Sequence, residues 1–384
     1  MADFTFKISP NITLGSYATS RLGEFASKYG NNYMLILDPV LRVVGNSEKI
    51  IQSLDDRNIN YFIFDEIKEN SDSQAINQAL DLARKSHIHG VIAAGGGKAI
   101  SIARAVSKLF NSTCNVYEYL DNGGDKDFSA IPLICLPTTN REPFVFTDKV
   151  PIVDSRNLQC KLMKIDSELC KMVIFDSNMT LTLTENQTES MSIESLCLAT
   201  EAYLSQKASF FSDMFSEKAI EILSYGMKGA DSLSITLGKE ELLAQGGCMA
   251  SLACSTSSFG AAYLLALTIN SRFQISKSLV TSILFPYVIE DYSEFKTDRV
   301  VKVAKNYRVE FSSEATKEEI CKAFADEIRQ RLAKANLPTR LKDLSISIEQ
   351  LSLAVEDASR LDYINTLPRS MSSDDLFKLI KMAY

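Results

Sequence analysis

The glycine triplet Gly95-Gly96-Gly97 is the segment of this chain best suited to bind an anion. It ends an apolar run over residues 90–94 and is followed at once by a helical pattern over residues 98–109. A glycine turn between a strand and a helix presents free backbone N–H groups to a phosphate. Glycine also tolerates positive φ and, because it lacks a Cβ, lets the backbone approach a ligand closely. The triplet therefore predicts a phosphate or dinucleotide site, and the alternative is a tight turn that holds no ligand.

Two charged residues near this turn suit a dinucleotide. Asp38 follows an apolar run over residues 33–37, where a carboxylate accepts the ribose hydroxyls of adenosine and repels a 2′-phosphate. If a dinucleotide binds, Asp38 favours NAD over NADP, although an Asp-Pro pair also starts turns without any ligand. Lys98 directly follows the triplet, where a cation suits a diphosphate but is equally consistent with a solvated surface lysine.

The first half of the chain alternates apolar runs with amphipathic segments, which predicts repeated strand–helix units. The expected strands are residues 33–37, 61–64, 90–94 and 131–136, and the expected helices are 47–54, 73–85 and 98–109. Short apolar strands joined by helices indicate a parallel sheet that is covered on both faces. Ligands of such sheets bind beyond the carboxyl ends of the strands, where Asp38, the glycine triplet and Thr138-Thr139 all fall.

From about residue 180 the pattern changes to long helical segments with few strands between them. The expected helices are 191–206, 215–223, 239–259, 276–292, 317–335 and 347–358. We therefore predict two domains: an α/β nucleotide-binding domain over residues 1–179 and an all-helical domain over residues 180–384.

Composition argues against several classes of protein. A net charge of −7, with no basic run interleaved with aromatic residues, argues against nucleic-acid binding. The longest apolar stretch, residues 261–267, is too short to cross a bilayer, and the first residues lack the pattern of a signal peptide. The eight cysteines form no CxxC pair and are expected to be reduced and mostly buried, so we expect a cytoplasmic protein. The two histidines, His87 and His89, are expected to be ordinary surface residues.

Nine segments spread over nearly the whole chain match the motifs of one known family, at residues 94–101, 136–139, 174–176, 201–203, 212–213, 283–288, 337–341, 367–369 and 383–384. In their order and spacing they resemble the iron-containing alcohol dehydrogenase family. The resemblance implies a Rossmann-like, dehydroquinate synthase-like fold with a helical second domain, and oxidoreductase activity on a small-molecule alcohol or aldehyde. It also implies an NAD cofactor, a divalent metal and a homo-oligomer.

The metal-binding histidines of that family are absent from this chain. By the resemblance, the family's Asp position falls on Glu194 and one His position falls on Leu198. The remaining His positions fall on Tyr263, Leu267 and Lys277. Leucine has no atom that can bind a metal and an ammonium group repels a cation, so no metal is expected here.

Three of these residues offer a replacement for the metal, which in the family polarises the substrate oxygen. Lys277 carries a positive charge and a proton, and Tyr263 can donate a hydrogen bond. Glu194 can pair with Lys277 and keep it charged. The alternative is that the lysine only neutralises a buried carboxylate and serves stability alone.

The loop after Thr138-Thr139 also departs from the family, which continues with a Gly-Thr-Gly-Ser run along the cofactor. Both glycines are replaced here, one by Arg141 and one by Pro143. Pro143 removes an N–H donor. Arg141 either pairs with a cofactor phosphate or blocks the pocket.

Two functions from different classes remain open. The first is an NAD-linked alcohol–aldehyde oxidoreductase that works without a metal. The second is a catalytically silent relative that binds a nucleotide or small ligand, or that serves as an interaction scaffold. A lyase or synthase of the dehydroquinate synthase type ranks last, because that chemistry also needs the missing metal.

Overall fold

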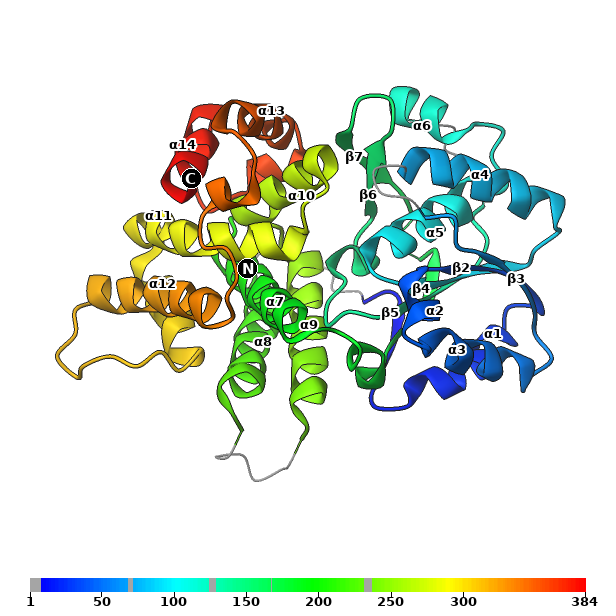
Figure 1. Ribbon diagram of the computed structural model, residues 1–384, viewed down its shortest axis with the longest axis horizontal. Helices are drawn as coiled ribbons and strands as arrows, with labels where there is room; N and C mark the ends of the chain where they lie inside the picture. Colours follow the sequence, from blue (N-terminus) through cyan, green and yellow to red (C-terminus); the bar gives the residue numbers. More distant parts are fainter. Residues whose placement is uncertain (1–7, 68–71, 124–128, 167, 231–236) are drawn as a thin grey trace. The chain divides into compact units, whose positions relative to one another are not determined.

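The computed structural model describes residues 8–67, 72–123, 129–166, 168–230 and 237–384 (Figure 1). These residues form two compact units. The first, which we call the sheet unit, runs to Asn157 and also includes Lys161–Thr180. The second, the helical unit, runs from Leu181 to Tyr384 and also includes Leu158–Cys160.

A parallel sheet of six strands forms the centre of the sheet unit, as far as this unit is described. Its strand order is β1-β8-β5-β4-β2-β3, and every adjacent pair runs parallel. The predicted α/β fold class is therefore confirmed. The strands are β1 (Asn11–Leu14), β2 (Asn32–Leu37), β3 (Asn60–Phe64), β4 (Gly90–Gly95), β5 (Leu133–Pro137) and β8 (Cys170–Phe175).

The interior strands are apolar because helices cover both faces of the sheet. All of β4, and all of β2 except its first residue, is buried. The helices α4 (Asp72–Lys85) and α5 (Gly97–Leu109) lie on one side of the sheet (Figure 1). The other side carries α1 (Leu22–Ala26), α2 (Val40–Val43) and α3 (Asn46–Asp55), whose Leu22, Phe25 and Leu54 share one core with β2 and β4.

Four strands were not predicted from the sequence. Two of them, β6 (Lys149–Asp154) and β7 (Gln159–Lys164), pair with each other outside the main sheet. Lys161 interrupts the apolar residues of β7, and β6 has a proline among its four apolar residues, which argues against an interior strand. The other two are β1, which is a short and partly exposed edge strand, and β8.

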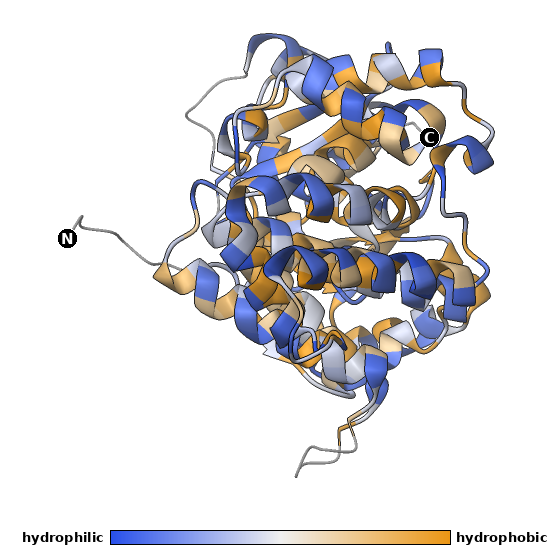
Figure 2. Ribbon diagram, turned by 90° about the vertical axis from the view of Figure 1, so that its left-hand side faces the viewer, coloured by the Kyte–Doolittle hydropathy of each residue, from blue (hydrophilic) through white to orange (hydrophobic). Residues whose placement is uncertain are grey.

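In its described residues the helical unit contains the predicted helices, with shifted ends, and two more. The additional helices are α10 (Ala261–Phe273) and α14 (Ser373–Ala383). Nearly every residue of α10 is buried, so its apolar residues show no helical periodicity. Figure 2 shows that hydrophilic and hydrophobic residues alternate along the outer helices, which is typical of one buried face. The predicted helices are α7 (Glu185–Leu204), α8 (Phe210–Lys228), α9 (Lys239–Thr256), α11 (Lys277–Asn306), α12 (Lys317–Lys334) and α13 (Ile348–Ser359).

Membrane-spanning potential is confined to one pair of helices in the part of the chain that the structure describes. No single helix there has the length and apolar composition to cross a bilayer. The helices α9 and α10 meet the test only when they are taken together, and they are bent by 99° at their junction. Most residues of both helices are buried.

Candidate functional site

The carboxyl ends of β2, β4 and β5 lie side by side in the sheet unit. The strand register pairs Gly95 of β4 with Pro137 of β5. Just beyond the strands, the N–H of Asp38 donates to the carbonyl of Ala94 at 2.9 Å, and the N–H of Thr138 donates to the carbonyl of Gly95 at 3.1 Å. The three segments predicted to meet at this edge of the sheet are therefore neighbours.

This edge is also where the strand order reverses. From β2 the chain adds β3 on one side, then returns to place β4 on the other side, and β5 continues outward from β4. Ligands of doubly wound sheets bind at such a point, because the connections on either side diverge and leave a crevice.

Gly95 and Gly96 are glycines for different reasons. Gly95 has a φ of +150°, and a Cβ there would lie 2.6 Å from the Cβ of Asp38 and 2.9 Å from that of Ala99. The fold itself therefore requires Gly95. Gly96 is the N-cap residue of α5, and no side chain at this position accepts a hydrogen bond from the first N–H groups of the helix. Among the described residues the atom nearest to a Cβ at Gly96 is Cγ2 of Thr139, at 3.9 Å, which leaves room for a ligand at the start of α5.

Substitutions at these two glycines are expected to have opposite effects. Gly96→Ser adds a favoured N-cap residue in open space, so stability should be unchanged or slightly higher, while the new side chain occupies the place of a bound phosphate. Gly95→Ala should destabilise the fold by about 1–3 kcal/mol, because its Cβ meets a disfavoured φ and Asp38. Thermal unfolding and titration with NAD⁺ separate the two effects. Unchanged NAD⁺ affinity in Gly96→Ser would contradict a phosphate site at this turn.

Asp38 and Lys98 each have a partner within the protein. Oδ1 of Asp38 accepts from the N–H of Val40 at 3.2 Å, which starts the turn into α2. Nζ of Lys98 lies 3.9 Å from Oδ1 of Asp72, a buried carboxylate that also accepts from the N–H of Val153 at 3.1 Å. A carboxylate has two oxygens and an ammonium has three donors, so both groups can serve a further partner. Their roles toward a cofactor stay predictions.

The loop that follows β5 is enclosed by protein. Oγ1 of Thr139 donates to the carbonyl of Arg141 at 2.9 Å and tightens the turn. Arg141 is only 9% exposed. Pro143 begins a short 3-10 helix, η2 (Pro143–Phe146). Arg141 is therefore an enclosed cation in the loop that follows β5, and its pairing with a phosphate stays a prediction.

Asn140 lies in the middle of this loop and is 2% exposed. Neither its amide nitrogen nor its amide oxygen has a hydrogen-bond partner in the described parts of the chain. A buried polar group without a partner costs about 1–3 kcal/mol, and native proteins contain few of them. Nothing in the sequence distinguishes this asparagine, because its burial depends on how the rest of the loop folds.

Arg104 of α5 holds the segment that follows this loop. The residue is 1% exposed, and its guanidinium donates to the carbonyls of Phe144, Thr147 and Lys149, the last at 3.0 Å. A guanidinium presents several N–H donors in one plane, so a single side chain can bind three carbonyls. This role of Arg104 was not predicted from the sequence. The one feature that could have indicated it is that Arg104 is a charged residue among the apolar residues of a predicted helix.

The candidate catalytic positions all lie in the helical unit. Glu194 and Leu198 are one turn apart on α7. Tyr263 and Leu267 are one turn apart on α10, and Lys277 is the first residue of α11. The first four are at most 3% exposed, whereas Lys277 is half-buried.

Side-chain contacts join the three helices that carry these positions. Between α7 and the start of α11, the hydroxyl of Ser282 donates to the carbonyl of Ser190 at 3.1 Å, and the hydroxyl of Ser190 donates to that of Ser278 at 3.3 Å. Glu201 of α7 connects to α10, as described next. The candidate catalytic residues are therefore carried by helices that contact one another.

Glu201 fixes the start of α10. Its buried carboxylate accepts the N–H groups of Gly260 at 3.1 Å, Ala262 at 2.8 Å and Tyr263 at 3.4 Å. A Cβ at Gly260 would lie 2.2 Å from Cδ of Glu201, so the carboxylate needs a glycine there. Burial raises the pKa of Glu201 to about 7, although the three backbone N–H groups favour the ionised form.

The residues that the resemblance assigns to the family's metal positions do not fit a divalent cation. Leu198 and Leu267 have no donor atom, and the ring of Tyr263 stacks on that of Phe259 with their centroids 5.2 Å apart. Glu194 is the one carboxylate at these positions. Within the described residues, no group of three or more His, Cys, Asp or Glu side chains is placed to hold a metal. The donor set that a metal needs is therefore not supplied here.

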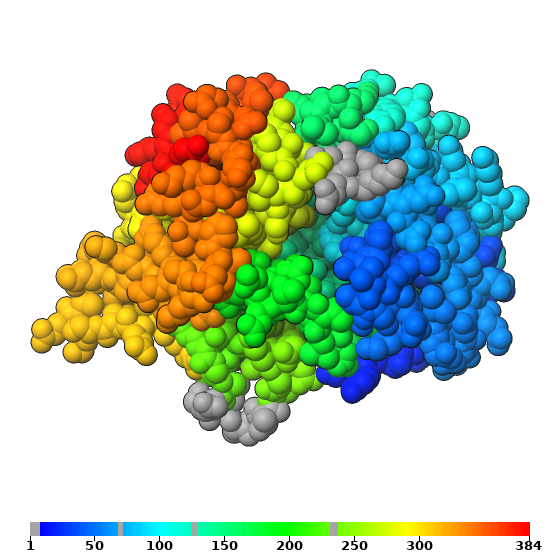
Figure 3. Space-filling model, viewed as in Figure 1, coloured from blue at the N-terminus to red at the C-terminus, as the bar shows by residue number. Residues whose placement is uncertain are grey.

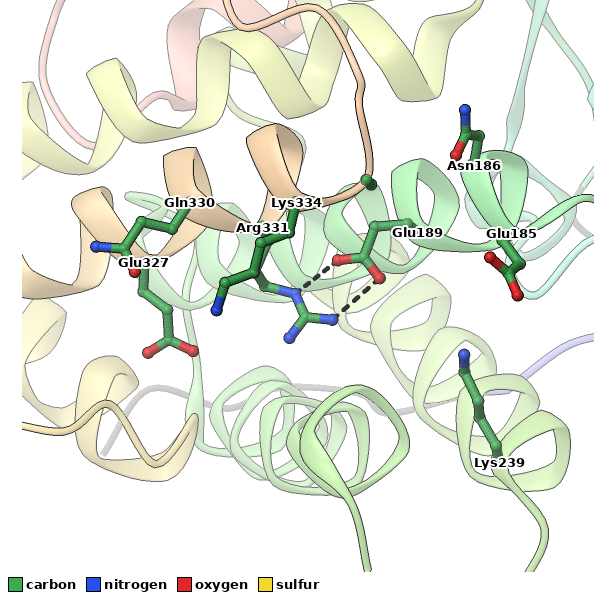
Figure 4. A pocket seen from close by; sticks show the side chains of 9 residues that line it. Glu185, Asn186, Glu189, Lys239, Glu327, Gln330, Arg331 and Lys334 are labelled. Atoms are coloured by element: carbon green, nitrogen blue, oxygen red, sulfur yellow. Dashed lines mark hydrogen bonds and ion pairs between the residues drawn. The ribbon is translucent and has the colours of Figure 1, made fainter.

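The helical unit also has a hollow of about 420 Å³ that none of these candidate residues lines (Figure 4). Figure 4 shows the side chains of Glu189 and Arg331 paired across it, with N···O distances of 2.6 and 3.0 Å. It is lined by α12 and by the first turns of α7 and α9. In the space-filling view α12 borders α7 on the visible face of the unit (Figure 3). The charged residues of both signs that line the hollow include the ion pair that joins α7 and α12. No predicted site residue lines the hollow.

Two family descriptions together match nearly the whole chain. Iron-containing alcohol dehydrogenase matches residues 9–177, and the C-terminal part of the Fe-containing alcohol dehydrogenase family matches residues 188–384. The chain therefore belongs to the iron-containing alcohol dehydrogenase family, and the resemblance drawn from its sequence motifs is confirmed.

Individual relatives are distant in sequence and close in fold. The chain is 24% identical to choline dehydrogenase of Bacillus subtilis, over 91% of this chain and 88% of that protein. The solved structure of a 1,3-propanediol oxidoreductase covers the whole of both chains with a TM-score of 0.90 and 18% identity. Sulfoacetaldehyde reductase of Bifidobacterium kashiwanohense, solved in complex with NAD⁺, covers 100% of this chain and 99% of its own with a TM-score of 0.82 and 17% identity.

Proposed function

We propose that this chain interconverts an alcohol and an aldehyde with NAD as the hydride carrier and without a bound metal. The observation that carries the proposal is the meeting of Asp38, the glycine turn and Thr138 at the reversal point of the sheet. Family membership supports the reaction class. The NAD⁺ complex of the sulfoacetaldehyde reductase supports the cofactor.

The sheet unit supplies the cofactor site. The start of α5 faces the diphosphate, with Gly96 leaving room for it and Lys98 adding a positive charge. Asp38 accepts the adenosine ribose hydroxyls and disfavours a 2′-phosphate, so NAD is preferred to NADP. Arg141, which is enclosed in the loop after β5, would add a second cation for the diphosphate.

The helical unit supplies the proton and the electrostatic stabilisation. A bound NADH would supply a hydride to the carbonyl carbon of an aldehyde. The negative charge that would develop on the carbonyl oxygen must be stabilised and then neutralised by a proton, and in alcohol oxidation the same proton donor takes that proton back. Lys277 and Tyr263 stand at positions that the resemblance assigns to the metal and could each donate to that oxygen, and Glu194 is the proposed partner of Lys277.

Two features of the chain favour a second function. Leu198 and Leu267 are buried where the family binds its metal, and Arg141 and Pro143 replace glycines of the cofactor loop. A relative that has lost catalysis would bind a nucleotide or small ligand, or act as a scaffold, and would tolerate the same substitutions.

A steady-state assay after dialysis against a chelator separates these two functions. We expect turnover of short alcohols with NAD⁺, or of aldehydes with NADH, that added Zn²⁺ or Fe²⁺ does not increase. Lys277→Ala should lower kcat by about 10²–10⁴-fold, and Tyr263→Phe tests the other donor. Activity that appears only after metal is added would contradict the proposal, and activity absent under every condition would favour the silent relative.

A further inference from the structure

We infer that the side-chain amide of Asn140 recognises the carboxamide of the nicotinamide ring. This inference rests on the proposed function, and it adds a specificity-determining residue that the family motif does not contain. It starts from an unusual feature of the sheet unit. Both polar atoms of a 98%-buried asparagine are unpaired within the described residues.

The order of the strands places Asn140 on the nicotinamide side of the site. The glycine turn follows β4, and β2 with Asp38 lies on one side of β4 while β5 lies on the other. If the adenosine ribose binds at Asp38 and the diphosphate at the turn, the second half of the dinucleotide must lie over the end of β5. Asn140 is three residues beyond Pro137, the last residue of that strand.

The loop that carries Asn140 is held at both ends. At its start the N–H of Thr138 donates to the carbonyl of Gly95, so the loop is bonded to the glycine turn itself. At its far end the carbonyl of Phe144 accepts from the buried guanidinium of Arg104. A binding group carried on a backbone fixed in this way is positioned before the ligand arrives.

The chemistry of the side chain matches the chemistry of the proposed ligand group. An asparagine amide has two donors and an acceptor, and so does the nicotinamide carboxamide, so the two can exchange a pair of hydrogen bonds. A ligand that reaches Asn140 must displace the groups that now cover it, and the two recovered hydrogen bonds offset that cost. The main alternative is a buried water that bridges the amide to the backbone.

Calorimetric titration of the full chain with NAD⁺ and with ADP-ribose, which lacks the nicotinamide, tests this inference. In Asn140→Leu we expect the affinity for NAD⁺ to fall at least about tenfold, which corresponds to about 1.4 kcal/mol, and the affinity for ADP-ribose to stay within about twofold. The melting temperature of the ligand-free variant should be unchanged or higher, because an unpaired amide is removed. Asn140→Ala gives the same comparison should leucine fail to fit.

Asn46 provides a matched control in the same unit. It is also 2% exposed, but its amide donates to the carbonyl of Met179 at 3.3 Å. Asn46→Leu should therefore lower the melting temperature and leave both affinities unchanged.

The possible outcomes distinguish this inference from the function on which it rests. Equal loss of NAD⁺ and ADP-ribose affinity, or no loss of either, would overturn the role of Asn140. Lower stability of ligand-free Asn140→Leu together with unchanged NAD⁺ affinity would indicate a bridging water instead. Failure of the wild-type chain to bind either probe would overturn the proposed cofactor site itself.

Discussion

Replacing Arg104 by methionine is expected to lower the free energy of unfolding of the sheet unit by about 3–5 kcal/mol. Methionine has a comparable length and fills much of the space, but it offers no donor to the carbonyls of Phe144, Thr147 and Lys149. Hydrogen bonds to a charged donor are worth about 1.5–3 kcal/mol each, and buried carbonyls that lose them stay desolvated. The loss exceeds that of most single substitutions.

Urea unfolding followed by circular dichroism measures this loss, and hydrogen exchange over residues 144–149 locates it. The free energy of unfolding of Arg104→Lys should lie between those of Arg104→Met and wild type, because an ammonium group keeps the charge but not the planar set of donors. Arg42→Met is a suitable control. The Arg42 side chain is 52% exposed and pairs with Asp65 at 2.8 Å, so its loss should cost at most about 1 kcal/mol. A similar small cost for Arg104→Met would contradict its role in holding the loop.

Glu201 is expected to make the stability of the chain fall between about pH 4.5 and pH 7. Its pKa is raised from 4.5 to about 7 in the folded protein, with burial as the largest cause. Below pH 4.5 the carboxyl is protonated in both states and its contribution is fully present. As the pH rises toward 7 the unfolded chain releases the proton while the folded chain retains it, so stability is lost. The total loss is about 3 kcal/mol.

The change is measured as the difference between wild type and Glu201→Gln across this pH range. Glutamine does not titrate, so the variant should lack the decrease even though it starts from a lower stability. All other titratable groups are common to both proteins, so their contributions cancel in the difference. A pH dependence that is identical in the two proteins would show that Glu201 is already ionised well below pH 7 when folded.

The sequence predicted the parts of this molecule that depend on local pattern. Interior strands such as β2 and β4 are continuous apolar runs, and the rule that parallel strands end at one edge correctly placed Asp38 beside Gly95 and Thr138. The helix α10 was not predicted, because its sequence lacks the local pattern of an amphipathic helix. It is buried on nearly all sides, so no polar face marks its period.

The parts that escaped prediction depend on partners far away in the chain. The carbonyls that Arg104 binds are 40–45 residues distant, and the N–H groups that Glu201 accepts are about 60 residues distant. Asn140 is distinguished only by the absence of such a partner within the described residues. Periodicity carries no information about contacts of this kind, so only the folded arrangement reveals them.

Isothermal titration with NADH, with and without Zn²⁺ or Fe²⁺ and after treatment with a chelator, tests the central claim most directly. We predict a dissociation constant on the order of 1–100 μM that neither the metals nor the chelator changes, because the proposed cofactor site consists of Asp38, the glycine turn and the loop after β5 and includes no metal ligand. Binding that appears only when a metal is added, or no binding under any of these conditions, would contradict it.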